Sequence, residues 1–205
     1  MKIDIIDIGI GNISSIENWL TNSNLAFNNV KKPNDISSNL IILPGVGSAK
    51  LYLKKLKDSK FDIAINKHIS NGGRMIGICL GFQVLFDHLE EDGGVNGLGF
   101  FRGNVLKLES NKSHTGWEKF ILKKKQLSPK WKSKILSKSK KQIITGRVFY
   151  NHNYGVVSKD KNLKIHLISE NLKYISFITS DQIIGFQFHP EKSQLTGKNL
   201  IELLY

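Results

Sequence analysis

The spacing of apolar residues changes its period along the first half of the chain. Three short apolar runs have the length and composition of buried strands: Lys2–Ile8, Asn39–Leu43 and Met75–Ile78. Between them, stretches with apolar residues on one helical face predict helices: Ile13–Asn22, Leu51–Leu56 and Phe61–Ile69. Strands that alternate with helices in this way favour a parallel sheet with helices on both faces.

The second half has a different pattern, in which short strand-like runs dominate. The predicted strands are Phe100–Leu108, Phe120–Leu122, Val148–Tyr150, Ile165–Ile168, Tyr174–Thr179 and Ile183–Phe188, and Lys198–Leu203 closes the chain as a helix. We therefore expect an α/β fold with a mostly parallel central sheet and an additional antiparallel β portion. No internal repeat or boundary divides the sequence, so residues 1–205 are expected to form a single domain.

Composition narrows the class of protein. The 205 residues are 40% hydrophobic, which suits a packed core, and no run approaches the roughly 20 apolar residues of a membrane span. The N-terminus lacks the layout of a signal peptide, and one cysteine cannot form an intramolecular disulfide framework. These features predict a cytoplasmic protein that does not enter a membrane.

The net charge of +13 comes mostly from the second half, above all from lysines within residues 123–141. Such a run can contact nucleic acid or an acidic protein surface, or it can be a solvated loop. Stacked bases require interleaved aromatic side chains, and Trp131 is the one aromatic residue inside the run. A solvated loop is the favoured interpretation, and no nucleic-acid partner is expected.

The single cysteine, Cys79, lies between a predicted strand and a predicted helix that leads through Gln83 to Phe86. Gly77-x-Cys79-x-Gly81 matches a nucleophile elbow with sulfur in place of oxygen. The two glycines allow close backbone approach at a sharp turn, and a helix start behind Cys79 would favour the reactive thiolate. The alternative is an inert buried cysteine, which is common in protein cores.

A thiol nucleophile needs a base, and His189 is the strongest candidate. It follows an apolar strand, and catalytic groups often gather where parallel strands end. Residues two apart on an extended segment point the same way, so Glu191 is expected to orient the His189 ring. The alternative is a surface turn in which a histidine and a glutamate meet by chance.

The other histidines carry weaker signals. His68 and His88 fall in helical patterns and are expected at the surface, whereas His166 alternates with apolar strand residues and is expected to be structural. No histidine clusters with cysteines, so no zinc site is expected.

Backbone N–H groups usually stabilise the oxyanion of a tetrahedral intermediate. Leu80, directly after the cysteine, offers one such group. The glycine turn at residues 45–47 offers a second, because small residues let backbone approach a substrate closely. An ordinary strand-to-helix turn is the alternative interpretation.

Together, five motifs resemble those of the class I (triad) glutamine amidotransferases. They are Asp7–Asn12 (Asp-Ile-Gly-Ile-Gly-Asn), Pro44–Gly47, Gly77–Phe86, His114–Trp117 (His-Thr-Gly-Trp) and Gly185–Ser193. They follow the family's order over nearly the whole chain, and Cys-Leu-Gly-x-Gln with a distant Phe-His-Pro-Glu is highly specific for the class. The Gly-Asn start and the His-x-Gly-Trp motif narrow the resemblance to the glutaminase subunits of imidazole glycerol phosphate synthase.

The resemblance implies a set of site residues and no cofactor or metal. Cys79 would attack the side-chain amide of L-glutamine, with His189 as proton shuttle and Glu191 behind it, so that ammonia and then glutamate are released. The other implied roles are glutamine binding (Gln83, Glu91, Asn153, Tyr154), the oxyanion hole (Gly47, Leu80) and contact with a partner (Asn12, Trp117, Lys192).

By the same resemblance, ammonia passes to a separate (β/α)₈-barrel cyclase subunit in a heterodimer, which forms imidazole glycerol phosphate and AICAR in histidine biosynthesis. A barrel needs roughly 250 residues of its own, and this chain ends soon after the triad. Because protonated ammonia is not a nucleophile, an internal channel across the docked interface is expected.

Some segments depart from the family pattern. The family reads Pro-His-Met-Gly-Trp-Asn where this chain has Ser113 and Glu118 around the motif, and Glu118 would add charge at an interface position. Phe149–Tyr154 replaces a Tyr-Phe-Val-His-Ser-Tyr segment. These changes spare the triad but leave a second acceptor open, namely enzymes that make amidino or amino sugars for surface polysaccharides. A γ-glutamyl hydrolase that acts without a partner and a non-catalytic binding module are the remaining alternatives.

Overall fold

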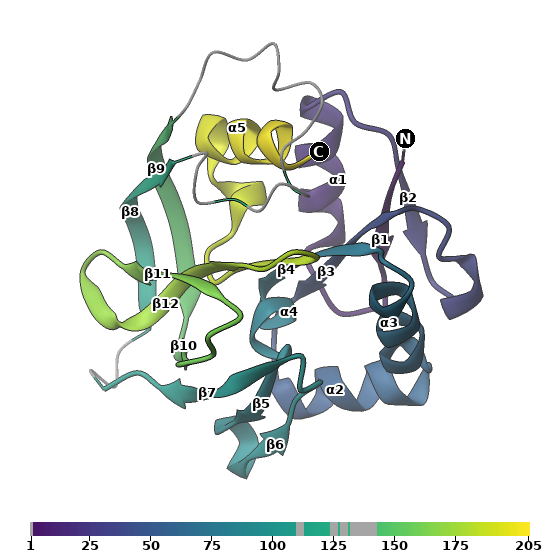
Figure 1. The fold of residues 1–205 in the computed structure, drawn as a ribbon, viewed down its shortest axis with the longest axis horizontal. Coiled ribbons are helices and arrows are strands. Elements are labelled where there is room, and N and C mark those ends of the chain that lie inside the picture. Colours follow the sequence, from purple (N-terminus) through teal and green to yellow (C-terminus); the bar gives the residue numbers. More distant parts are fainter. Residues whose placement is uncertain (1, 110–112, 124–126, 128–130, 132–142) are drawn as a thin grey trace.

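A seven-stranded sheet runs through the middle of the molecule, as the computed structural model of the chain shows (Figure 1). The structure describes residues 2–109, 113–123, 127, 131 and 143–205. The strand order is β11-β12-β13-β4-β3-β1-β2. The bounds of these strands are Ile3–Ile6 (β1), Phe27–Val30 (β2), Leu40–Gly45 (β3), Arg74–Cys79 (β4), Lys164–Ile168 (β11), Asn171–Thr179 (β12) and Ile183–Phe186 (β13).

Five neighbouring strands, from β2 to β13, are parallel and form the centre of the sheet. β1 and β3 are buried at every position, as expected for strands that are covered on both faces. β12 pairs antiparallel with β13, and β11 pairs antiparallel with β12, which extends the sheet at one edge. The predicted α/β fold with a mostly parallel central sheet is confirmed.

Helices cover both faces of this sheet (Figure 1). α1 (Ile13–Asn22) and α5 (Gln194–Leu204) lie on one face, and α2 (Ala49–Asp58) and α3 (Phe61–Ser70) lie on the other. Because successive strand residues point to opposite faces, one strand contributes side chains to both hydrophobic clusters, one on each face of the sheet.

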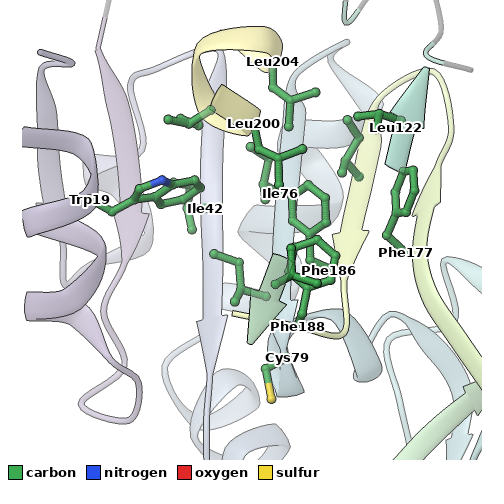
Figure 2. Packing of buried hydrophobic residues seen from close by; sticks show 14 of the residues in the cluster. Trp19, Ile42, Ile76, Cys79, Leu122, Phe177, Phe186, Phe188, Leu200 and Leu204 are labelled. Carbon is green, nitrogen blue, oxygen red and sulfur yellow. The ribbon is translucent and has the colours of Figure 1, made fainter. Parts of the chain in front are cut away.

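Ile42 belongs to the cluster with α1 and α5, whereas its neighbour Ile41 belongs to the cluster with α2 and α3. In Figure 2, Trp19 and Leu200 pack over Ile42 and its neighbours, and Cys79 lies at the end of this cluster with its sulfur pointing away from it. The thiol of Cys79 therefore lies at the edge of the packed core.

Two smaller sheets complete the described structure. One has the order β10-β7-β5-β6 and is antiparallel except for the β5–β7 pair; the other pairs β8 with β9. Their bounds are Phe86–Leu89 (β5), Val95–Asn96 (β6), Phe101–Lys107 (β7), His114–Lys123 (β8), Ile143–His152 (β9) and Tyr154–Val157 (β10). The additional antiparallel β portion is thus confirmed.

Several predicted elements differ in extent. The helix predicted after Cys79 is a single turn, α4 (Leu80–Gln83), and the chain enters β5 at Phe86. Pro44 and Gly45, predicted in a turn, end β3 instead. The strands predicted at residues 120–122 and 148–150 are parts of ten-residue strands, and β2, β6 and β10 were not predicted.

The lysine-rich run at residues 123–141 falls mostly outside the described residues. Trp131 within it is fully buried, and its Nε1 donates to the Ser180 carbonyl oxygen at 3.0 Å. No helix within the described residues combines the length and hydropathy that crossing a membrane requires.

Candidate active site

Cys79 ends β4 at the carboxyl edge of the central sheet. Its φ of 53° and ψ of −112° form a backbone conformation that a non-glycine residue adopts only where surrounding structure holds it. The residue is 6% exposed, and its Sγ lies 4.0 Å from the Asn151 carbonyl oxygen. This strained turn between a strand and a helix has the form of a nucleophile elbow.

Three glycines allow β3, β4 and α4 to meet around Cys79. A Cβ on Gly81 would lie 2.0 Å from the Leu43 carbonyl oxygen, and one on Gly77 would lie 2.8 Å from the Gly81 carbonyl oxygen. A Cβ on Gly45 would lie 2.4 Å from the Gly81 nitrogen. Close backbone approach therefore explains all three glycines, and it locks the turn that presents Cys79.

His189 reaches Cys79 from the neighbouring strand. β13 runs parallel to β4 with Phe186 opposite Ile78, and the chain continues from there to His189. The His189 N–H donates to the Phe149 carbonyl oxygen at 2.8 Å, which ties the residue to β9. Parallel pairing thus brings two residues that are distant in sequence to one edge of the sheet.

Glu191 lies behind His189, with 2.7 Å between its Oε1 and His189 Nδ1. The predicted contact forms, but the local structure that makes it differs from the prediction. Residues Pro190–Lys192 form a 3₁₀ turn instead of the extended segment that was expected. The Glu191 side chain is 1% exposed, and its Oε2 has no hydrogen-bond partner within the described residues. A carboxylate in this position holds the proton on Nδ1 and leaves Nε2 for the sulfur.

The groups around His189 favour its protonated form. Burial alone would lower the pKa of His189, but hydrogen bonds to Cys79 and Glu191, together with their charges, raise it to about 10. An imidazolium is therefore stabilised between the sulfur and the carboxylate. Such an arrangement can hold a nucleophile and a proton donor ready for attack on an amide.

A cleft of about 470 Å³ opens beside these groups, within the size range of small-molecule sites. It brings together ten of the residues predicted for the site: Asn12, Gly47, Cys79, Leu80, Gln83, Glu91, Asn153, Tyr154, His189 and Lys192. The predicted binding residues and the predicted reacting residues therefore share one cavity.

Gln83 is buried in the wall of this cleft. Its Nε2 donates to the Tyr154 carbonyl oxygen at 2.7 Å and to Gln187 Oε1 at 2.9 Å. Both amide hydrogens are thus used inside the protein, and contact with a ligand would have to use Gln83 Oε1.

Glu91 begins the 3₁₀ turn Glu91–Gly93, and its Oε2 accepts a hydrogen bond from the Ala49 N–H at 3.0 Å. Burial raises the pKa of Glu91, while the Ala49 bond opposes that shift. A carboxylate at this end of the cleft is suited to a cationic group of a ligand.

The two residues predicted for the oxyanion hole, Gly47 and Leu80, line the same cleft as Cys79. Gly47 has a φ of +87°, and a Cβ there would meet nothing within 4 Å, so backbone conformation rather than crowding favours glycine. Leu80 opens a helix of only four residues, so the macrodipole expected behind Cys79 is reduced to the N–H groups of one turn.

The residues expected to face a partner occupy two places. Asn12 and Lys192 line the cleft itself. Trp117 lies in β8, at a separate depression of about 430 Å³ that also includes Arg147 and Leu195. Leu195 is 70% exposed, so this depression has an apolar rim.

Sequence reasoning missed a group that extends inward from the wall of the cleft, formed by His152 of β9 and by His114 and Glu118 of β8. Glu118 is 4% exposed, which corrects the expectation that it adds charge at an interface. Alternation explains its burial, because Glu118 has the same strand phase as Phe120 and Leu122, which face the core. That signal was present in the sequence.

Three other histidines lie away from the cleft. His88 is exposed as expected but belongs to β5 rather than a helix, and half-buried His68 places Nε2 3.0 Å from the Arg74 carbonyl oxygen. His166 stacks on Phe177 with ring centroids 4.0 Å apart, which fits the structural role predicted for it. Within the described part of the chain, no group of three His, Cys, Asp or Glu side chains could hold a metal ion.

Comparison with known proteins agrees with this geometry. Residues 4–203 match the family model described as Glutamine amidotransferase class-I. The chain is 33% identical to "Imidazole glycerol phosphate synthase subunit HisH" of Aquifex aeolicus over 98% of this chain and 95% of the relative. It is 33% identical to the protein of the same name from Sulfolobus acidocaldarius, over 100% and 98% of the two chains.

Solved structures share the fold at lower identity. "Crystal structure of glutamine amidotransferase" superposes with a TM-score of 0.72 at 13% identity, covering 98% of both chains. "Structure of PurLQS from Thermotoga maritima" superposes with a TM-score of 0.71 at 18% identity, covering 99% of this chain and 96% of the other.

Proposed function

Because this chain belongs to the class I glutamine amidotransferases, we propose that it is the glutaminase subunit of an imidazole glycerol phosphate synthase in histidine biosynthesis. The observation that carries the proposal is the hydrogen-bonded series Cys79, His189 and Glu191 at one sheet edge. His189 bonds Cys79 on one side, and its Nδ1 lies 2.7 Å from Glu191 Oε1 on the other. The names of relatives at 33% identity support the pathway. In this proposal residues 1–205 act as one amidotransferase domain in the cytoplasm.

The reaction begins when the Cys79 thiolate attacks the side-chain carbonyl carbon of glutamine, and the N–H groups of Gly47 and Leu80 stabilise the oxyanion. His189 protonates the amide nitrogen, the C–N bond breaks, and ammonia leaves a γ-glutamyl thioester on Cys79. His189 then takes a proton from water, hydroxide adds to the thioester, and the C–S bond breaks to release glutamate. Glu191 stabilises the imidazolium in both halves of the reaction.

The walls of the cleft supply the contacts for glutamine. The Glu91 carboxylate is suited to the α-ammonium group, and Gln83 can contribute Oε1 because its amide hydrogens are already used. Asn153 and Tyr154 line the same cleft and complete the pocket. This division places the charged end of glutamine at Glu91 and its amide at Cys79.

Ammonia must leave the site as neutral NH₃, because protonation removes its nucleophilicity. A separate (β/α)₈-barrel cyclase subunit, docked as a heterodimer over an internal channel, would receive it without exposure to bulk water. Asn12 and Lys192 at the cleft, and Trp117 at the separate depression, are the residues that would face this subunit.

The alternative acceptor, a sugar-modifying synthase, stayed open partly because Glu118 was expected to place a charge on the surface that faces the partner. Since Glu118 is buried and paired with His114, that charge is not presented to a partner. Of the two departures, exposed Ser113 alone remains on the surface. The histidine-pathway cyclase is therefore the acceptor we propose.

Glutamate release from glutamine tests the proposal, with the wild-type chain and Cys79→Ala each assayed alone, with the cyclase and its ribotide ligand, and with a sugar-modifying synthase. Turnover should require Cys79 and rise strongly with the cyclase and its ligand. Turnover by Cys79→Ala would overturn the mechanism. A response to the sugar synthase alone would move the chain to the other pathway, and full turnover without any partner would indicate a γ-glutamyl hydrolase.

A further inference from the structure

Three side chains form a continuous line from the interior of β8 to the wall of the cleft. Glu118 Oε1 lies 2.5 Å from His114 Nε2, and His114 Nδ1 lies 2.8 Å from His152 Nε2. His152 Nδ1 lies 2.8 Å from the Tyr154 carbonyl oxygen. The β8–β9 register places His114 directly opposite His152, so strand pairing builds the line. We refer to Glu118, His114 and His152 as the relay.

The carbonyl at one end fixes the proton order of the relay. A carbonyl oxygen can only accept, so His152 must carry its proton on Nδ1. Its Nε2 then accepts, and His114 must donate from Nδ1. One proton remains between His114 Nε2 and Glu118 Oε1, so each of the three contacts holds one proton, and the two bonds from His114 to His152 and from His152 to Tyr154 both point toward Tyr154.

The surroundings keep the relay free of net charge. Burial, together with the charges of His114 and His189, lowers the pKa of His152 to about 3, although its bond to Tyr154 opposes the shift. The His114–Glu118 pair is neutral overall wherever the shared proton lies. Glu118 Oε2 has no hydrogen-bond partner within the described residues, so a carboxylate without His114 would be buried and uncompensated.

The Tyr154 carbonyl joins the relay to the substrate cleft. It accepts from His152 Nδ1 at 2.8 Å and from Gln83 Nε2 at 2.7 Å, and Gln83 continues to Gln187. Tyr154 also lines the cleft, as does His152, whereas Glu118 and His114 do not. Within the relay, the effect of Glu118 and His114 on a ligand therefore passes through His152.

We propose that Glu118 and His114 are positioning residues for glutamine, which hold the His152 ring through the hydrogen bond that His114 Nδ1 donates to His152 Nε2, and so hold the 151–154 wall of the cleft in its binding shape. The inference rests on the proposed function, because it takes glutamine as the ligand. A buried ion pair that served stability alone would leave glutamine affinity unchanged when it was removed, and this difference makes the two roles separable.

Two substitutions of Glu118 differ in whether they preserve the proton order. In Glu118→Gln, the amide N–H₂ can donate to His114 Nε2, so His114 keeps its proton on Nδ1. In Glu118→Ala, His114 Nε2 loses its partner, and only the bond to His152 still favours a proton on His114 Nδ1. The other His114 tautomer leaves His152 Nε2 without a donor. Leu122→Ala is the matched control, because Leu122 is a buried residue of the same strand face outside the relay.

Steady-state glutamine hydrolysis in the complex with the cyclase gives the first readout. For Glu118→Ala we expect KM to rise about tenfold, equivalent to about 1.4 kcal/mol, with kcat within about twofold of wild type. Glu118→Gln should return KM close to the wild-type value. Leu122→Ala should lower the melting temperature without changing KM.

Long-range ¹H–¹⁵N correlation spectra of the histidine rings give a second readout that needs no turnover. We expect His114 to be protonated on Nδ1 in the wild type and Glu118→Gln, and to become a tautomer mixture in Glu118→Ala. If wild-type turnover is normal but KM or the His114 tautomer is unchanged in Glu118→Ala, the positioning role is overturned and the proposed function stands. If the wild type neither binds nor hydrolyses glutamine, the proposed function is overturned and the assignment of the ligand falls with it.

Discussion

At the scale of single residues, the carboxylate of Glu191 sets the charge state of His189. The Glu191 side chain is 1% exposed and contacts His189 Nδ1 at 2.7 Å, and it contributes to the raised pKa of His189. Glu191→Gln keeps the shape but removes the charge, so the imidazolium formed during attack loses its stabilisation. We expect kcat to fall about 10²- to 10⁴-fold in the complex, with a small change in KM.

Steady-state kinetics over a range of pH measures this effect, because removal of the carboxylate should also lower the pKa of His189. Glu202→Gln on α5 is a suitable control, since Glu202 is a half-exposed carboxylate that pairs with Lys198 at 3.9 Å, away from the cleft. A kcat for Glu191→Gln close to that of wild type would show that the carboxylate is not part of the catalytic machinery.

Among the contacts between single residues, that of Cys79 with His189 could be predicted from the sequence, whereas those within the relay could not. Residue type and strand ends were enough to predict that Cys79 and His189 would meet, because the carboxyl ends of parallel strands share one edge. The relay could not be predicted in this way. His114 and His152 are 38 positions apart and meet through the register of β8 and β9, which local patterns do not specify.

At the scale of elements, the contact between β3 and α4 depends on Gly81. A Cβ there would lie 2.0 Å from the Leu43 carbonyl oxygen, and rigid strand backbone cannot yield as a flexible side chain can. We expect Gly81→Ala to lower the free energy of unfolding by about 3 kcal/mol or more. Denaturant unfolding followed by circular dichroism measures the change.

Gly72→Ala separates crowding from backbone strain. Gly72 has a φ of +86°, and a Cβ there would meet nothing within 4 Å, so alanine adds conformational strain alone. We expect a loss of about 1 to 2 kcal/mol for this control. If Gly81→Ala were no more costly than Gly72→Ala, the tight junction of β3 and α4 would not be what holds the elbow.

Element extents were the least predictable part of the fold. The prediction of α1 matched its bounds because Ile16 and Leu20 form an apolar face with no competing pattern. Behind Cys79, a helix was predicted through to Phe86, but a short apolar run is compatible with either element, and pairing with β7 makes Phe86–Leu89 a strand. β2 has polar residues at Asn28 and Asn29, so its pairing with β1 could not be read from hydrophobic alternation.

At the scale of the whole molecule, alternation of strands and helices was sufficient to predict the layered α/β sheet. It was not sufficient to predict how the antiparallel part adjoins the site. β9 supplies the Phe149 carbonyl that fixes His189, and the segment from β9 into β10 forms a wall of the cleft. The site is therefore a product of both halves of the chain, which ties its integrity to global stability.

One buried and one half-buried histidine, His152 and His166, make that stability sensitive to acid. Burial lowers the pKa of His166 to about 4, and burial with neighbouring charges lowers that of His152 to about 3, against 6.5 for an unperturbed histidine. Between about pH 4 and 6.5 the unfolded chain therefore binds more protons than the native chain. The stability that these two histidines contribute is present above pH 6.5 and is lost as the pH falls. The raised pKa of His189 acts in the opposite sense, because its contribution is lost as the pH rises from 6.5 toward about 10.

Substitution of His166 isolates one of these protons. Near pH 5.5 a single such histidine contributes a slope of about 1 kcal/mol per pH unit to the free energy of unfolding. His166→Phe and His166→Gln differ in how well they stack on Phe177, so their absolute stabilities should differ, yet both remove the same titration. Denaturant unfolding at pH 5, 6 and 7 should therefore show the same flattening of slope in both variants. An unchanged slope in both would mean that the pKa of His166 is the same in the native and the unfolded chain, and the acid sensitivity would then have to be assigned to His152.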